Sequence, residues 1–75
     1  MTTEDSQLTL AKLRDRAGLT QRQLADALGV TVTTISNWER GTKEPTMNFA
    51  QVKKMTEVLQ CSLDELVEAT QKRSL

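Results

Sequence analysis

An all-α fold, a compact bundle of five short helices, is what this sequence predicts. Polar residues that cap helices precede its apolar runs, and glycines follow three of these runs. Apolar residues recur every three or four positions, and no run alternates with period two long enough for a β-strand. A chain of 75 residues supports one hydrophobic core, so a single domain is expected over residues 7–72, between a flexible leader at 1–6 and a flexible tail at 73–75.

The first three helices are expected at residues 7–17, 20–28 and 31–40. Thr20 and Gln23 have the capping-box spacing, whereas Thr31 is a weaker cap because Thr34 cannot reciprocate. Each helix is followed by a glycine that can take the left-handed conformation that closes a helix: Gly18, Gly29 and Gly41. Each also has one apolar stripe: Leu10, Leu13 and Ala17, then Leu24 and Leu28, then Ile35 and Trp38.

The last two helices are expected at residues 48–60 and 62–72. Both begin with a capping-box pair: Asn48 with Gln51, and Ser62 with Glu65. Their apolar stripes are Val52, Met55 and Leu59, then Leu63, Leu66 and Val67, with Leu63 and Leu66 expected in the core. Cys61 is expected to be a small buried hydrophobe.

The composition excludes several kinds of site. One cysteine and no histidine cannot form an internal disulfide, a common zinc site or a Cys–His nucleophile pair. We therefore expect no enzyme, no metal and no cofactor. The longest apolar stretch, Ala27–Val30, is too short for a signal peptide or a membrane span, so we expect no membrane partner. Because a chain with one cysteine does not depend on an oxidising compartment, we expect a cytoplasmic protein.

The centre of the chain has the pattern of two short helices that cross closely. Ala25 is small enough to let a second helix approach, and Gly29 can reverse the chain directly after the first helix. Ile35 supplies the buried counterpart on the second helix. This pattern predicts a helix-turn-helix from about Gln21 to Arg40.

Around this pattern the sequence resembles the Cro/C1-type, or XRE-like, helix-turn-helix regulators. The motifs that carry the resemblance span residues 10–66: Gly-Leu-Thr-Gln at 18–21, Leu-Ala-x-x-Leu-Gly-Val at 24–30, Thr-Ile-Ser-x-Trp-Glu-x-Gly at 34–41, Pro45, and Ser-Leu-Asp-Glu-Leu at 62–66. Pro45 and Ser62 lie further apart here than in typical members. The resemblance implies a lambda-repressor-like fold that binds double-stranded DNA, with the third helix in the major groove.

The outward face of the third helix is the expected reader of bases. If Ile35 and Trp38 point inward, the opposite side carries Thr33, Ser36, Asn37 and Arg40, with Val32 at the exposed start. Asn37 can bond bidentately to adenine, Thr33 can donate or accept, and Val32 can contact a thymine methyl. The positions matched in the family give the same expected base contacts: Val32, Thr33 and Asn37.

Phosphate contacts are expected from six residues: Gln21, Arg22, Thr31, Ser36, Arg40 and Lys43. Gln21 matches the family's phosphate-binding glutamine at a helix start, and Arg40 and Lys43 match positions that contact the DNA backbone. The resemblance also implies a structural ion pair between Arg14 and Glu39, which removes Arg14 from the DNA-binding surface.

The predicted function is that of a sequence-specific transcription regulator associated with the nucleoid, most simply a repressor. We expect it to bind DNA as a homodimer through the last helix or the segment that leads into it, where Leu63, Leu66, Val67 and Leu75 offer apolar surface, and to bind no small-molecule ligand. The alternative is a protein-interaction or antitoxin-like module with the same fold. Its support is the net charge of zero, which is unusual for a protein that binds phosphates.

Overall fold

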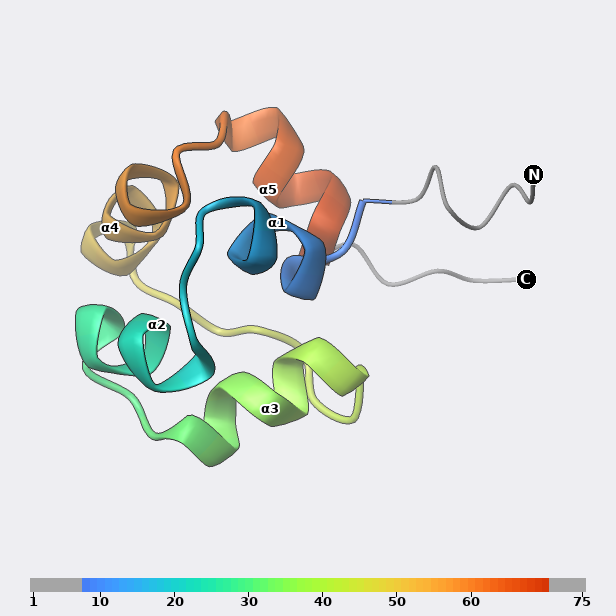
Figure 1. The fold of residues 1–75 in the computed structure, drawn as a ribbon, viewed down its shortest axis with the longest axis vertical. Coiled ribbons are helices and arrows are strands. Elements are labelled where there is room, and N and C mark those ends of the chain that lie inside the picture. The colour runs from blue at the N-terminus through green and yellow to red at the C-terminus, as the bar shows by residue number, and fades with distance from the viewer. Residues whose placement is uncertain (1–7, 71–75) are drawn as a thin grey trace, which may run out of the picture.

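A computed structural model describes residues 8–70, which contain five helices and no strand (Figure 1). The helices are α1 (Leu10–Arg16), α2 (Gln21–Leu28), α3 (Val32–Arg40), α4 (Phe49–Leu59) and α5 (Leu63–Thr70). The predicted all-α fold of five helices is confirmed. The predicted leader at 1–6, the tail at 73–75 and the expected end of the last helix at 72 lie outside the described residues.

The first helix begins later than the sequence predicted, because Leu8 and Thr9 are not helical. Thr9 has extended backbone angles, and its side chain accepts a hydrogen bond from the amide of Lys12 at 3.1 Å. A residue that caps a helix in this way has non-helical backbone angles, so the helix starts at the next position. The start expected at residue 7 was therefore wrong, and α1 is a helix of 7 residues.

The other helix starts follow the expected caps. Thr20 and Asn48 each form a full capping box, and Ser62 exchanges the same two bonds with Glu65, at 3.0 and 3.1 Å. Thr31 accepts from the Thr34 amide at 3.1 Å, and the two hydroxyl groups lie 2.9 Å apart. The two threonine side chains thus share a hydrogen bond, whereas a glutamate or glutamine at position 34 would instead bond to the Thr31 amide.

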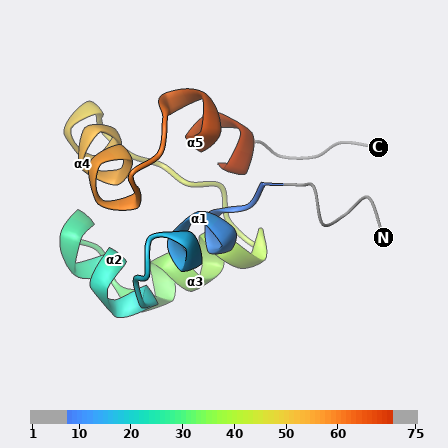
Figure 2. The ribbon, with the colours of Figure 1, turned by 45° about the horizontal axis from the view of Figure 1, so that its top comes forward.

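The core lies where α1, α2, α3 and α4 meet, with α5 packed against α1 (Figures 1 and 2). In both views α1 lies between α3 on one side and α5 on the other. In the described part of the chain ten apolar side chains are buried: Leu10, Leu13, Leu24, Ala25, Leu28, Ile35, Trp38, Met55, Leu59 and Leu66.

The apolar stripe of α5 is only partly buried. Leu66 is 3% exposed and lies in the core as expected, but Leu63 is 57% exposed and Val67 is 53% exposed. The expectation that Leu63 is a core residue was therefore wrong, because α5 lies at the edge of the bundle and one side chain of its stripe faces the core. Cys61 is half-buried and packs against the core, so it is less enclosed than the sequence suggested.

Within residues 8–70 no helix is long and apolar enough to cross a membrane. The same part of the chain holds no group of three or more residues that could bind a metal ion.

Candidate nucleic-acid interface

The turn between α2 and α3 places these two helices in close contact. Gly29 ends α2 with φ 73°, a left-handed conformation that costs glycine little. The chain then reverses, and the amide of Val30 donates to the carbonyl of Ala25 at 3.0 Å. Ala25 is 1% exposed, so its methyl group fills the helix crossing without pushing α3 away. Gly29 and Ala25 thus allow the tight turn and the close helix crossing that the sequence predicted for the helix-turn-helix.

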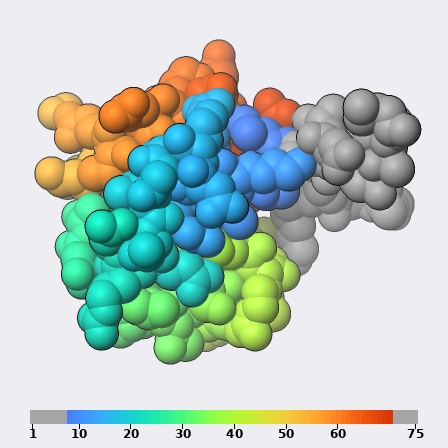
Figure 3. Space-filling view, viewed as in Figure 1, coloured from blue at the N-terminus to red at the C-terminus, as the bar shows by residue number. Residues whose placement is uncertain are grey.

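Helix α3 presents one face to the core and the other to solvent. Ile35 is fully buried and Trp38 is 8% exposed, which fixes the rotation of the helix about its axis. Val32 and Thr33, at the start of the helix, are exposed. In the space-filling view, α2 and α3 lie next to each other along one edge of the molecule (Figure 3). An exposed helix at an edge is the element that can enter a groove of DNA.

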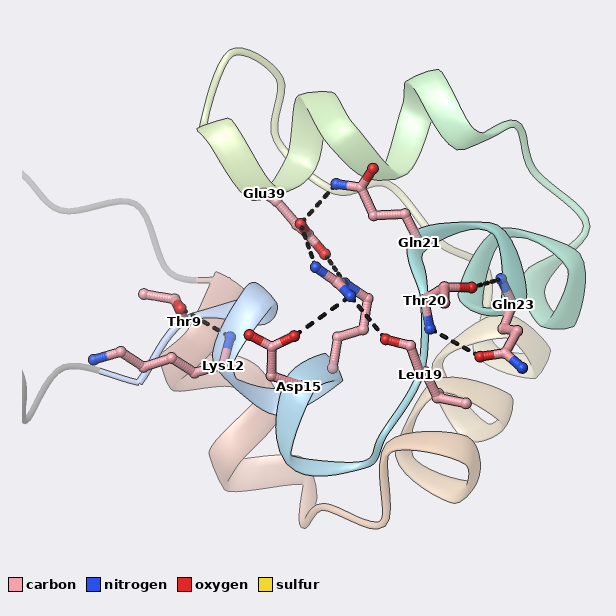
Figure 4. A network of polar contacts seen from close by, with 9 residues as sticks. Thr9, Lys12, Asp15, Leu19, Thr20, Gln21, Gln23 and Glu39 are labelled. Atoms are coloured by element: carbon pink, nitrogen blue, oxygen red, sulfur yellow. Dashed lines mark hydrogen bonds and ion pairs between the residues drawn. The ribbon is translucent and has the colours of Figure 1, made fainter.

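An ion pair joins α1 to the end of α3 (Figure 4). Arg14 Nε donates to Glu39 Oε2 at 2.6 Å, and Arg14 Nη1 donates to the carbonyl of Leu19 at 2.7 Å. The side chains of Arg14 and Glu39 are only 15% and 7% exposed. The structure thus contains the pair implied by the family resemblance, and it ties α1, the chain before α2, and α3 together.

Gln21 joins the same network. Its Nε2 donates to Glu39 Oε1 at 2.9 Å, a contact that sequence reasoning missed. No local signal marks this contact, because Gln21 and Glu39 belong to different helices and neither lies in a motif that specifies the other. One Nε2 hydrogen of Gln21 is donated to Glu39. The side chain is half-buried, and its second Nε2 hydrogen can be donated to another acceptor.

The hydrogen bond with Glu39 raises the pKa of Arg14, against the opposing effect of burial, and the charge of Glu39 acts in the same direction. The guanidinium is therefore a fixed positive charge inside the fold. The guanidinium faces Glu39, Leu19 and Asp15. Its charge therefore stabilises the fold and does not add to the outer face of α3.

A comparison with protein families decides the family of the chain. A family model described as helix-turn-helix matches residues 10–66, which is most of the chain. The chain belongs to the Cro/C1-type, XRE-like helix-turn-helix family. This family is a DNA-binding regulator family and not an enzyme family. No curated protein and no solved structure matches the chain.

In this helix-turn-helix protein, the expected DNA-contacting residues fall into two groups. Six are exposed: Arg22, Thr31, Val32, Thr33, Arg40 and Lys43. Three are half-buried: Gln21, Ser36 and Asn37. The structure brings Asn37 and Arg40 into direct contact, since Arg40 Nη2 donates to Asn37 Oδ1 at 2.8 Å.

Thr42 is a neighbour of the site that sequence reasoning missed. Its hydroxyl lies 3.2 Å from Asn37 Oδ1, on the far side of the turn that follows α3. The signal was present in the sequence, because Gly41 predicts a left-handed turn that folds the next residue back over the last turn of the helix.

A second ion pair, between α1 and α5, was also missed. Arg16 donates to both carboxylate oxygens of Glu65, at 3.2 and 3.1 Å, on the surface of the molecule. The bond from Arg16 is the main cause that lowers the pKa of Glu65, and the Ser62 amide adds to it. Burial raises the pKa of the nearby Cys61 thiol. These groups lie on the α1–α5 side, and we assign them to stability.

Proposed function

We propose that this protein is a sequence-specific transcription regulator, most simply a repressor, that reads double-stranded DNA with α3 in the major groove. The observation that carries the proposal is the exposed, uncharged start of α3, where Val32 and Thr33 project from a helix anchored by Ile35 and Trp38. The major groove is about 12 Å wide and admits one α-helix. Val32, Thr33 and Asn37 are the base-contacting residues in this proposal.

The phosphates on either side of the groove are assigned to residues that flank α3. Arg22 lies in the first turn of α2, Thr31 is the cap of α3, and Lys43 follows its end. Such contacts fix the register of a protein on DNA without reading its sequence. Three further residues complete this set in the proposal: Gln21, Ser36 and Arg40.

The test is selection of bound fragments from a pool of random duplex DNA. The proposal predicts enrichment of one sequence family, whose bound members lose affinity when single base pairs are changed. A good bidentate base contact contributes about 1–3 kcal/mol of discrimination, so single changes should be measurable. A pool that remains random after selection, although the protein is folded, would contradict the proposal.

We further propose that the protein acts as a two-fold dimer through α5. Leu63 and Val67 lie one helical turn apart and are 57% and 53% exposed, so they form an apolar strip that the protomer does not cover. Leu75, which the sequence also suggested for this surface, lies outside the described residues. A two-fold arrangement would require a roughly palindromic site with half-sites about 34 Å apart.

Sedimentation on a selected palindrome and on one isolated half-site tests the dimer. Two protomers are expected on the palindrome and one on the half-site. Val67→Glu should lose the gain in affinity on the palindrome and keep half-site binding, whereas the exposed control Glu68→Gln should change neither. One protomer bound to the full palindrome would refute the dimer.

A protein-interaction module is the second candidate, and the zero net charge favours it. A partner protein would then occupy the outer face of α3 in place of DNA. Apolar contact dominates many such interfaces, and their stability changes little with salt, whereas phosphate binding weakens steeply as salt is added.

A further inference from the structure

The side-chain amide of Asn37 is held in one orientation by its neighbours. Arg40 Nη2 lies 2.8 Å from Oδ1, and the Thr42 hydroxyl lies 3.2 Å from the same atom. A guanidinium only donates hydrogen bonds, so the Asn37 atom that faces Arg40 must be the oxygen and not the nitrogen. The amide nitrogen, Nδ2, consequently points away from Arg40 and has no partner among residues 8–70.

The turn after α3 directs the hydroxyl of Thr42 to the same oxygen. Gly41 has φ 78°, and the next amide, that of Thr42, donates to the Asn37 carbonyl at 3.1 Å. The Gly41 amide is shared between the carbonyls of Asn37 and Trp38. The hydroxyl of Thr42 lies 3.2 Å from both the main-chain oxygen and Oδ1 of Asn37, so Oδ1 is one of its two acceptors.

These contacts limit what Asn37 can read. Bidentate recognition of adenine needs the amide oxygen to accept from N6 while the nitrogen donates to N7. In this structure Oδ1 already accepts from Arg40 and Thr42, and an amide oxygen has two lone pairs. The side chain therefore offers donors only. Guanine presents two acceptors, N7 and O6, on its major-groove edge, which suits a reader of this kind.

We propose that Thr42 is a specificity-determining residue, which together with Arg40 holds Asn37 as a donor-only reader that selects guanine over adenine. The inference rests on the proposed function and replaces the adenine contact expected from the sequence. Thr42 acts through Asn37 and needs no contact with DNA, so it is a positioning residue. Arg40 retains other guanidinium hydrogens for a phosphate, which would couple phosphate binding to the orientation of Asn37.

The experiment measures binding of the full chain to duplexes taken from the selection, with guanine or adenine at each position in turn. Asn37→Ala identifies the position that depends on Asn37. At that position the wild type should prefer guanine on the order of tenfold, the scale of a specific base contact. Thr42→Val removes the hydroxyl at nearly constant shape and frees one lone pair of Oδ1. It should shift the preference toward adenine, whereas Thr42→Ser, which keeps the hydroxyl, should not.

Thermal unfolding of each variant provides the control, because a merely structural role of Thr42 would change stability and leave the guanine-to-adenine ratio as it was. Four results overturn the inference alone while the DNA-binding function stands: adenine preferred at the position that depends on Asn37, no such position, a ratio that Thr42→Val leaves unchanged, or a ratio that Thr42→Ser shifts as much as Thr42→Val. Failure to select any DNA sequence overturns the proposed function, and this inference with it.

Discussion

Replacing Arg14 with methionine is expected to destabilise the protein more than any exposed substitution on α3. The change removes the 2.6 Å bond to Glu39 and the 2.7 Å bond to the Leu19 carbonyl. Among residues 8–70 it leaves the Glu39 carboxylate, which is 7% exposed, with the Gln21 amide as its one remaining partner. Breaking a fully buried ion pair costs about 3–5 kcal/mol, and the 15% exposure of Arg14 brings the expected loss to about 2–4 kcal/mol.

Replacing the other partner of the ion pair, Glu39, should lower the free energy of unfolding by a smaller amount. In Glu39→Gln the side chain keeps one oxygen that can accept from Arg14, and the guanidinium keeps the Leu19 carbonyl and the charge of Asp15. Loss of one charge-assisted bond is expected to cost about 1.5–3 kcal/mol. The asymmetry follows from the structure, because Arg14 keeps the Leu19 carbonyl and the nearby Asp15 carboxylate when Glu39 is replaced, whereas Glu39 loses the one positive charge that it pairs with among residues 8–70.

A double-mutant cycle in urea unfolding measures both numbers. The coupling energy between Arg14→Met and Glu39→Gln is expected to be on the order of 0.5–3 kcal/mol. A loss of 1 kcal/mol lowers the Tm of a domain this small by roughly 4–8 °C, so each effect should also be visible in thermal unfolding. Additive effects, with no coupling, would refute the conclusion that this pair joins α1 to α3.

Three more expectations concern other parts of the molecule. Lys43→Ala should weaken binding to all DNA sequences alike and reduce the magnitude of the salt slope by about one, and a loss confined to certain sequences would instead make Lys43 a base reader. Ile35→Val should cost about 0.5–1.5 kcal/mol in urea unfolding because the side chain is fully buried, and no loss would show that the core can collapse around it. The lowered pKa of Glu65 stabilises the fold at pH values above the usual glutamate pKa, and this contribution is lost as the pH falls through the lowered pKa. Glu65→Gln should therefore be less stable than the wild type at neutral pH, and the difference should shrink in acid when Tm is followed between about pH 7 and pH 3. A constant difference over that range would contradict this assignment.

Local chemistry accounts for what the sequence predicted about the fold. Thr20 and Asn48 each have a glutamine three residues later, and both form the expected capping boxes because the bonds involve neighbouring residues only. Thr9 lacks such a partner, so its cap was not recognised and the start of α1 was placed too early. The exposure of Leu63 could not be foreseen either, because helical periodicity gives a stripe and does not say which member lies at the edge of the bundle.

The candidate site divides in the same way. The inward position of Ile35 and Trp38, and so the outward start of α3, followed from spacing. The contact of Gln21 with Glu39 did not, because it forms across the interface between α2 and α3 and depends on how these helices pack. The contact of Asn37 with Thr42 is local, across the left-handed turn that Gly41 marks, and it was missed although the sequence held its signal. Such contacts change what a side chain can read without changing the motif that contains it.

The salt dependence of binding to a selected duplex tests the DNA-binding claim most directly. Fluorescence anisotropy would give Kd over a series of salt concentrations, for the selected duplex and for a duplex of the same composition with permuted bases. Arg22, Arg40 and Lys43 are the cationic phosphate contacts proposed for each protomer, so log Kobs against log salt should have a slope of about −5 for a dimer, and the permuted duplex should bind more weakly throughout. Binding that is insensitive to salt, or equal for the two duplexes, would contradict sequence-specific recognition of DNA by α3.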